Sequence, residues 1–418
     1  MSGDRYAAMN QLSRFLALAL SVSIFTWNIR LFELGSDIKS LHLVAALMVI
    51  LACQRSVHYK DFWGFLACVL IPVFALPNVR DTGSFTTSYV MWTLTAAFFF
   101  FAIPYLSRTL SSSEKIFALR VAFGFMTLAG AFGVFQFFAN NFMGLRIYNF
   151  FGPLQAHPHF GNTILGIDRS TSIFIEPSQF AWVSLFFIAL AAYLYKNRVE
   201  IGLPRWRWHL LVVILGLVAS LSAVGYIGFV ILAAILVFEE RGRLSSRYLY
   251  GVSAFLGGVV GLALTGAYRF LRLDTIAVEG TSGFQRLIAP FLALRDTLEH
   301  YPLLGRGLGQ QGVADLLLAN SEEIIHNAVF GFWIVFGLFG GALILFFFAQ
   351  SYIKNLWAGK AAILPLFMLA YMYLSTGAFI ALEIPFLLTL ASFAVSLAAE
   401  RDRAPHKPPP AVRPELSS

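Results

Sequence analysis

One polar stretch of an otherwise apolar sequence, residues 285–341, holds most of the side chains that could carry chemistry. It contains three arginines, three glycines spaced by one, and a His-Asn pair: Arg286, Arg295, Arg306, Gly305, Gly307, Gly309, His326 and Asn327. Guanidinium groups match the oxygens of a phosphate. Glycines let backbone N–H groups approach an anion closely. This composition is typical of a site for a phosphate or diphosphate.

The glycine run GRGLG has a second interpretation. It is neither a Rossmann nor a P-loop signature, because no predicted strand precedes it and no Lys-Ser/Thr follows. Isolated glycine clusters usually mark loops, so a plain flexible turn is the alternative to an anion cradle. Each arginine could likewise bind a lipid headgroup instead of a substrate. Four arginines on one side, counting Arg169 of an earlier polar loop, favour the anion site.

Two further side chains could move protons. His326 could act as a general base or orient an acceptor hydroxyl, and the alternative is a structural histidine at a helix start. Glu176 precedes Pro177, a residue that suits the first position of a helix. A carboxylate there complements the helix dipole, and it could also deprotonate a hydroxyl.

No metal or cofactor is expected. His157 and His159 flank Pro158, but no matching cysteine or carboxylate cluster accompanies them. Cys53 and Cys68 fall in apolar segments and suggest no disulfide framework.

The composition identifies the scaffold. The chain is 58% hydrophobic and 12% charged, and its mean hydropathy is +0.73. Soluble proteins carry about twice that charged fraction. We therefore expect an all-α, polytopic integral membrane protein, in which helices satisfy the backbone inside the bilayer. The net charge of +8 is attributed to basic cytoplasmic loops, so no nucleic-acid partner is expected.

Apolar runs predict about twelve transmembrane helices. Their approximate ranges are 12–29, 38–53, 62–78, 88–107, 116–140, 178–195, 206–222, 224–239, 249–268, 326–350, 361–380 and 383–399. The first lacks a small-residue cleavage site and is interpreted as an uncleaved anchor.

These spans divide the chain into six parts. The predicted parts are N-terminal helices 1–140, a first outer loop 141–177, central helices 178–268, a large outer loop 269–325 with an amphipathic helix, C-terminal helices 326–399 and a disordered cytoplasmic tail 400–418. Most Lys and Arg residues fall in the predicted cytoplasmic loops, and only Arg30, Lys39 and Arg80 fall in short outer ones. We therefore expect both termini in the cytoplasm and both long loops on the outer face.

Helix signals place the candidate residues within the large loop. Ser282 and Gln285 fit a capping box that opens an amphipathic helix on the membrane surface, and Pro290 should kink it. Asn320 with Glu323 predicts the start of the next helix, which would put His326 in its second turn.

The order Arg286, PLLGRGLG and HNAVFGFWIVFGLFGG resembles the C-terminal signature of the O-antigen ligase and polymerase family. The upstream run RSTSIFIEPSQFA is similar to a stretch of the family's exopolysaccharide polymerase members. Together these motifs cover roughly residues 168–341. Arg306 departs from the pattern, because a small or apolar residue is more usual there.

The resemblance implies a membrane glycosyltransferase of the GT-C type. It would act at the outer face of the bacterial cytoplasmic membrane, without a metal, on glycans carried by undecaprenyl diphosphate. Arg169 and Arg286 would neutralise the leaving diphosphate, His326 would activate or position the attacking hydroxyl, and Glu176 is the alternative base. The remaining candidates for substrate binding are Arg295, Arg306, Gly305, Gly307, Gly309 and Asn327. A flippase and a chain-length regulator are the expected partner proteins.

Three activities remain open at this point. A polymerase joins lipid-linked repeat units, whereas a ligase transfers the glycan to lipid A core, and the Glu-Pro-Ser run favours the polymerase. A transporter or flippase predicts ionisable residues along a path through the membrane. The nearest candidates, Arg120, His209 and Glu383, all lie toward span ends, which favours catalysis.

Overall fold

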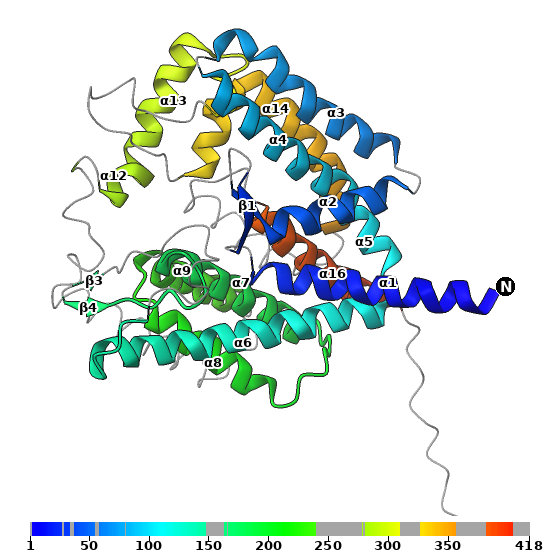
Figure 1. Cartoon of the computed structure of the whole chain (residues 1–418), viewed down its shortest axis with the longest axis vertical. Helices are drawn as coiled ribbons and strands as arrows, with labels where there is room; N and C mark the ends of the chain where they lie inside the picture. The colour runs from blue at the N-terminus through cyan, green and yellow to red at the C-terminus, as the bar shows by residue number, and fades with distance from the viewer. Residues whose placement is uncertain are drawn as a thin grey trace, which may run out of the picture.

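The structure is a computed structural model, and it is almost entirely helical in the part of the chain that it describes (Figure 1). The described residues are 2–26, 29–33, 37–54, 58–79, 81–147, 163–164, 166–239, 278, 281–309, 327–356 and 382–403. The all-α fold class is therefore confirmed. The only strands in these ranges form two short antiparallel pairs, β1 (Arg30–Glu33) with β2 (Asp37–Lys39) and β3 (Thr163–Ile164) with β4 (Ile167–Asp168).

The helices follow the predicted spans closely. They are α1 (Ser2–Ser23), α2 (Ser40–Cys53), α3 (Tyr59–Phe74) with η1 (Leu76–Asn78), α4 (Thr82–Ala97), η2 (Phe98–Ala102), α5 (Ile103–Thr109), α6 (Ser112–Phe142), α7 (Pro177–Lys196), α8 (Trp206–Ala219), α9 (Ala223–Glu239), α12 (Ser282–Leu287), α13 (Ala289–His300), α14 (Ala328–Leu356) and α16 (Glu383–Arg403). Ten of the predicted spans fall on these helices. The spans at 249–268 and 361–380 lie outside the described residues.

Six described helical segments are long and apolar enough to cross a membrane. They are Tyr59–Asn78, Thr82–Thr109, Ser112–Phe142, Pro177–Lys196, Ala328–Ser351 and Glu383–Asp402. The chain is therefore a membrane protein by the length and composition of its helices. The predicted span at 206–222 is too long, because α8 ends at Ala219 and a turn through Leu221, whose φ is +44°, leads into α9.

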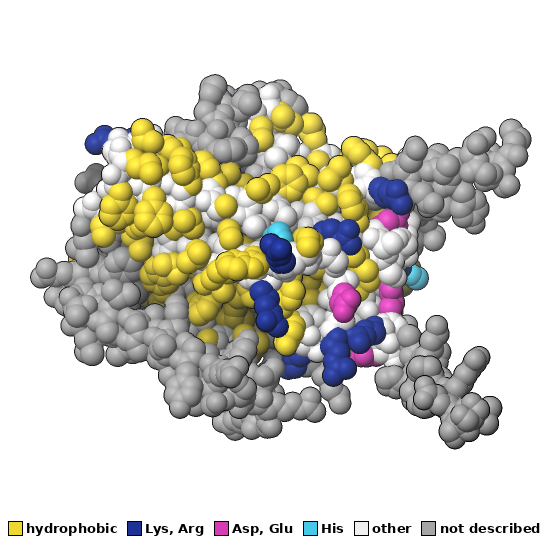
Figure 2. Space-filling model, turned by 90° about the horizontal axis from the view of Figure 1, so that it is seen from below, with side chains coloured by type: hydrophobic (Ala, Val, Ile, Leu, Met, Phe, Trp, Pro, Cys, Tyr) yellow, Lys and Arg dark blue, Asp and Glu magenta, His cyan; other side chains and the backbone are white. Residues whose placement is uncertain are grey.

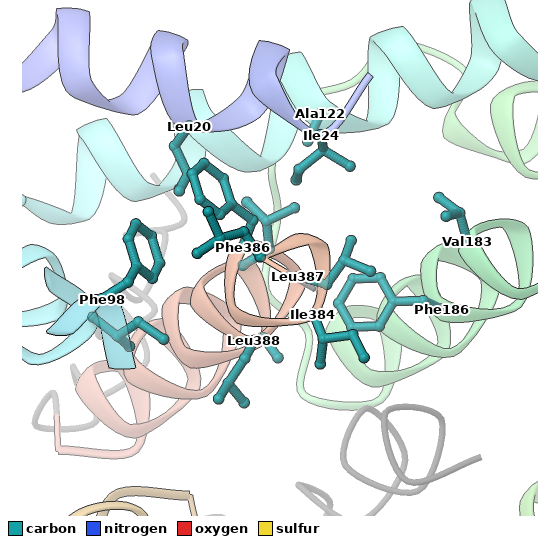
Figure 3. Packing of buried hydrophobic residues seen from close by; sticks show 14 of the residues in the cluster. Leu20, Ile24, Phe98, Ala122, Val183, Phe186, Ile384, Phe386, Leu387 and Leu388 are labelled. Atoms are coloured by element: carbon teal, nitrogen blue, oxygen red, sulfur yellow. The ribbon is translucent and has the colours of Figure 1, made fainter. Parts of the chain in front are cut away.

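The core is built around α16. Figure 3 shows Phe386 and Leu387 of α16 between Leu20 of α1, Phe98 of η2 and Phe186 of α7. The rings of Phe98 and Phe386 stack with centroids 4.6 Å apart. A helix that is apolar on all sides needs neighbours all round, and α16 obtains them from α5, α6 and α7.

The two ends of this bundle differ in charge. The N-terminal end of α1 and the C-terminal end of α16 lie on the right in Figure 1, and β3, β4 and α12 lie on the left. Ion pairs occur at the right-hand end, between Arg108 and Asp61 at 3.9 Å and between Lys115 and Glu400 at 3.1 Å. In Figure 2, most of the visible Lys and Arg side chains gather toward this same end.

Helix α14 is broken in its apolar stretch, which the single predicted span 326–350 did not anticipate. Gly337 has φ +64° and ψ −175°, a backbone conformation open essentially to glycine alone. A break inside a membrane leaves N–H and C=O groups without helical partners, and each unsatisfied group costs several kcal/mol there.

The turn after α13 satisfies the groups freed by this break. The carbonyls of Ile334 and Val335 accept hydrogen bonds from the N–H groups of Arg306 and Gly307, at 2.9 and 3.1 Å. In the opposite direction, the N–H groups of residues 338, 339 and 340 donate to the carbonyls of residues 302 and 303, at 2.8–3.1 Å. The turn 302–307 is therefore inserted into α14 and continues its hydrogen bonding.

Two glycines make this insertion possible. A Cβ on Gly337 would lie 2.5 Å from the amide nitrogen of Gly305, and a Cβ on Gly305 would lie 2.4 Å from the carbonyl oxygen of Val335. Both contacts are to backbone atoms, which cannot move aside as the end of a side chain can. The two backbones approach closely only because neither residue carries a side chain.

Gly337→Ala should therefore destabilise the protein. We expect a loss of folded protein or a fall of several degrees in the midpoint of thermal unfolding in detergent, because the change adds both a steric clash and backbone strain. The matched control is Gly124→Ala in α6, where a new Cβ meets no atom within 4 Å. The control should be neutral or stabilising by up to about 1 kcal/mol. Equal effects of the two substitutions would contradict this account.

Candidate functional site

Helices α12 and α13 carry Arg286 and Arg295. Helix α12 is capped by Thr281, whose hydroxyl accepts from the N–H of Phe284 at 3.3 Å. The predicted capping box at Ser282 is therefore wrong by one residue. Pro290 lies in the first turn of α13, so the predicted kink is a full break between two short helices.

Arg286 is held next to the start of α14. The side chain of Asn327, which is only 5% exposed, makes two hydrogen bonds. Its Oδ1 accepts from the N–H of Phe330 at 3.2 Å and so caps α14. Its Nδ2 donates to the backbone carbonyl of Arg286 at 3.4 Å. Two sequence-predicted site residues, 41 positions apart, are thus brought together.

His326 lies outside the described residues, but the chain fixes its neighbourhood. It directly precedes Asn327, and α14 begins at Ala328. The predicted cap at Asn320 and the predicted place of His326 in a second helical turn lie outside the described residues, within which α14 begins at Ala328 after the Asn327 cap. His326 is therefore the chain neighbour of Asn327, whose side chain donates a hydrogen bond to the backbone of Arg286.

The glycine turn does not present its first N–H groups to a ligand. The N–H of Gly305 donates to the carbonyl of Tyr301 at 3.0 Å, and those of Arg306 and Gly307 are used by α14. The side chain of Asn78 donates to the carbonyl of Gly305 at 2.8 Å. Gly309, at φ +77°, packs against the backbone of Ser84. Neither the anion cradle nor the flexible turn describes this segment, which is a tightly packed insertion.

Arg306 and Arg295 have carboxylate partners within the protein. Buried Arg306 pairs with Asp296 of α13, whose other carboxylate oxygen lies 3.2 Å from Nδ1 of His300. Arg295 is exposed and pairs with Glu299 at 2.8 Å. The Arg295 hydrogen bond and charge lower the pKa of Glu299.

These ion pairs give Arg306 and Arg295 contacts within the protein. The pairing with Asp296 accounts for an arginine at position 306, where the family pattern favours a small residue, because Arg306 joins α13 to the inserted turn. Arg295 and Arg306 are each engaged by a carboxylate of α13, and the anion hypothesis for the four arginines stays a prediction.

Arg169 begins a loop that is fixed by one buried glutamine of α6. Oε1 of Gln136 accepts from the N–H groups of Thr171 and Ser172 at 2.9 and 2.8 Å and from the hydroxyl of Ser170 at 2.9 Å. Nε2 of Gln136 donates to the carbonyl of Ile147 at 2.6 Å. These bonds anchor both ends of the first long loop to α6.

Two further contacts set the position of Arg169 itself. Its Nε lies 3.5 Å from the carbonyl oxygen of Ser220, after the end of α8. The preceding residue, Asp168, exchanges two hydrogen bonds with the side chain of Asn141, at 2.8 and 2.9 Å. The backbone on both sides of Arg169 is thus held by side chains of α6.

Glu176 occupies the N-cap position of α7, with Pro177 in the first turn as predicted. Its carboxylate does not cap the backbone, but accepts a hydrogen bond from the hydroxyl of Ser178 at 2.8 Å. The side chain is half-buried. Strand β4, which directly precedes Arg169, lies at the same end of the bundle as α12 (Figure 1).

Sequence analysis did not identify several residues that shape this site. Gln136 had a usable signal, since it is a polar side chain inside an apolar span. Gly337 belonged to the glycine-rich end of the recognised signature, but its break was not predicted. Asp296 and Asn78 gave no signal, because their partners are ten and 227 positions away in the chain.

Substitutions of Asn327 can separate its two contacts. Asn327→Asp keeps an oxygen that caps α14 but loses the donor to the Arg286 carbonyl, whereas Asn327→Ala loses both. We expect the thermal stability of the Asp variant to stay near wild type and that of the Ala variant to fall by about 1 kcal/mol. Both should lower the activity of the protein in membranes. Wild-type activity of both variants would show that the contact with Arg286 is dispensable.

Gln136→Leu should lower stability more than a surface change of the same type. It leaves the buried N–H groups of Thr171 and Ser172 without their acceptor, at about 1–3 kcal/mol for each group. Gln54→Leu, at an exposed position after α2, is the control. Thermal unfolding of the two purified variants gives the comparison, and similar midpoints would contradict the anchoring role.

A comparison with known families now identifies the chain. The family model described as WcaD colanic acid polymerase matches residues 15–397. No curated protein matches the chain. The match covers the helical bundle together with both long loops, and it agrees with the resemblance to exopolysaccharide polymerases carried by the RSTSIFIEPSQFA, GRGLG and HNAVFGFW motifs. The chain belongs to the WcaD colanic acid polymerase family, whose members are membrane polymerases of exopolysaccharide synthesis.

Proposed function

We propose that this polymerase joins oligosaccharide repeat units carried on undecaprenyl diphosphate, at the outer face of the bacterial cytoplasmic membrane. The observation that carries the proposal is the hydrogen bond from Asn327 to the Arg286 carbonyl. It places an arginine beside the residue that follows His326, at the end of the bundle where Arg169 begins its anchored loop.

The reaction breaks the bond between C1 of the donor sugar and the diphosphate oxygen. A hydroxyl oxygen of the acceptor glycan forms the new bond to C1, and the electron pair of the broken bond leaves with the diphosphate. Negative charge grows on that diphosphate, and fixed guanidinium groups stabilise it in a site of low dielectric constant. Arg169 and Arg286 take this role in the proposal, as part of a GT-C-type enzyme.

The acceptor hydroxyl must lose its proton during this step. His326 is the proposed base or orienting group, because an imidazole can accept a proton near neutral pH. Glu176 is the alternative base. Its carboxylate accepts a hydrogen bond from the hydroxyl of Ser178 at 2.8 Å.

No metal is assigned a role in this mechanism. The two arginines supply the positive charge that a divalent cation would otherwise bring to the diphosphate. Arg306, Gly305 and Gly307 support the site indirectly in this proposal, because they hold α13 and the inserted turn against α14. Arg295, which pairs with Glu299 within α13, and Gly309, which packs against Ser84 of α4, stay candidates for substrate binding.

The competing activities are less well supported. Family membership favours polymerisation over ligation to lipid A core. Broken helices also occur in transporters, where freed backbone groups coordinate ions or substrates. At Gly337 the freed carbonyls of residues 334 and 335 and the N–H groups of residues 338–340 are bonded to the turn 302–307. The break in α14 therefore gives no support to transport.

The basic end of the bundle supports the proposed orientation. Lys and Arg accumulate on the cytoplasmic side of membrane proteins, and on the face seen in Figure 2 most of them gather toward the end where α1 begins and α16 ends. This charge distribution supports an outer-face position for the candidate site. A flippase that delivers the lipid-linked units and a chain-length regulator are the proposed partner proteins.

Arg286 and His326 should be required for polymer synthesis. Arg286→Ala and His326→Ala are each expected to lower chain extension by at least a hundredfold, because each removes an interaction made with the reacting groups. Arg286→Lys should rescue poorly, since it keeps the charge but loses the bidentate fork. Arg14→Ala, at an exposed position of α1, is the control.

The assay uses purified full-length protein and purified lipid-linked repeat units, with product length resolved on gels. Protein amount and thermal stability are measured for each variant, so that misfolding is recognised. Normal-length polymer from both Arg286→Ala and His326→Ala would reject the assigned site. Transfer of the glycan to lipid A core without chain extension would instead support the ligase.

A further inference from the structure

A cavity lies at the opposite end of the bundle from the candidate site. Its volume is about 510 Å³, and it is enclosed by α6, the C-terminal end of α7, the segment 197–205, the start of α8 and the end of α16. Its inner wall is apolar and includes Phe123, Leu194 and Leu210. Arg198 and Arg401 also line it. None of these residues belongs to the proposed polymerisation site.

The wall of the cavity is held by defined interactions. Nε of Arg120 donates to the carbonyl of Ile201 at 2.8 Å and so ties the segment 197–205 to α6. A guanidinium nitrogen of Arg401 donates to the carbonyl of Asn197 at 3.0 Å and also to that of Arg198. These bonds hold the end of α16 against the end of α7. Hydrogen bonds between α6, α16 and the segment 197–205 therefore hold the wall of the cavity in place.

Two aromatic rings lie beside the basic groups. Tyr195 and Trp206 both line the cavity, and their ring centroids are 5.6 Å apart. Tyr and Trp are enriched where a membrane's apolar interior meets its headgroups. The cavity thus combines an apolar wall, two aromatics of the interfacial type and two arginines, which are the groups that suit the acyl chain, glycerol and phosphate of a phospholipid.

We propose that this cavity binds an acidic glycerophospholipid. The acyl chain lies against the apolar wall, and the phosphate meets the guanidinium groups of Arg198 and Arg401. Glu200 is the one carboxylate that lines the cavity, and His209, the other titratable group besides Tyr195, has its Nδ1 3.0 Å from the hydroxyl of Thr127. Two arginines against one glutamate leave a net positive charge, which favours an anionic headgroup over a zwitterionic one.

The surroundings agree with this charge preference. Arg205 and Arg207 are exposed beside the cavity at the start of α8. Figure 2 looks onto the side of the molecule where α8 lies in Figure 1, and it shows basic side chains next to apolar surface toward the end where α1 begins. Basic pockets between transmembrane helices are known sites for acidic lipid headgroups.

The test measures lipid binding by the full-length protein in neutral detergent. Dioleoylphosphatidylglycerol is the probe, with dioleoylphosphatidylcholine and glycerol 1-phosphate as the comparison compounds. Thermal unfolding and native mass spectrometry are the readouts, since a ligand that binds the folded state raises its midpoint. Arg198→Gln tests the site. Arg207→Gln, which changes an exposed arginine that does not line the cavity, is the matched control.

We expect only the phosphatidylglycerol to raise the midpoint of the wild-type protein and to be retained in the spectrum. Arg198→Gln should weaken its binding about fivefold, because each basic side chain near a headgroup contributes about that factor. Arg207→Gln should bind as the wild type does. Leu210→Trp, which fills the apolar part, should lower retention of the lipid.

Three results would overturn the proposal. Equal binding of phosphatidylcholine would exclude recognition of charge. Equal binding of glycerol 1-phosphate would show a site for free anions without a lipid tail. Equal loss of binding in the Arg198→Gln and Arg207→Gln variants would show a general electrostatic effect of the surface. The polymerisation assay plays no part in this test, so its outcome and that of the proposed function are independent.

Discussion

The insertion of the turn 302–307 into broken helix α14 is the constraint on which the candidate-site end of this structure depends. A membrane-spanning helix cannot leave its backbone groups unpaired, because the bilayer offers no water to replace them. The turn replaces the missing helical bonds in both directions, through the carbonyls of Ile334 and Val335 and the N–H groups of residues 338–340. This exchange fixes α13 relative to α14, since the turn directly follows α13.

The candidate site follows from that arrangement. With α13 fixed, the Asp296–Arg306 ion pair holds the last turns of α13 against the insertion. The shorter α12 is then held by Asn327, which joins the carbonyl of Arg286 to the start of α14. Arg286 is thus positioned through its backbone carbonyl, and the loop of Arg169 is held by Gln136 and Asn141.

The two ends of the bundle differ in structure and in charge. The end that carries Arg169, Arg286 and Glu176 is formed by loops and short helices that are anchored by polar side chains inside the bundle. The other end is rich in Lys and Arg and holds a cavity with an apolar wall. A charge asymmetry of this kind orients a membrane protein during insertion, and at the basic end it also attracts acidic lipids.

Sequence alone determined the class of the protein and the position of its helices, because the periodicity and length of apolar runs are local properties. It also predicted Arg169, Arg286 and Asn327 as site residues, because their motifs are contiguous in the chain, and these roles stay predictions. The tertiary structure determined the features that depend on contacts between distant parts of the chain. It turned GRGLG from an anion cradle into a packed insertion, gave Arg306 a carboxylate partner in Asp296, and broke α14 at Gly337. Each of these features depends on backbone or charged groups that are far apart in the chain. Such groups pair because an unpaired polar group is costly in the low-dielectric interior of the bundle.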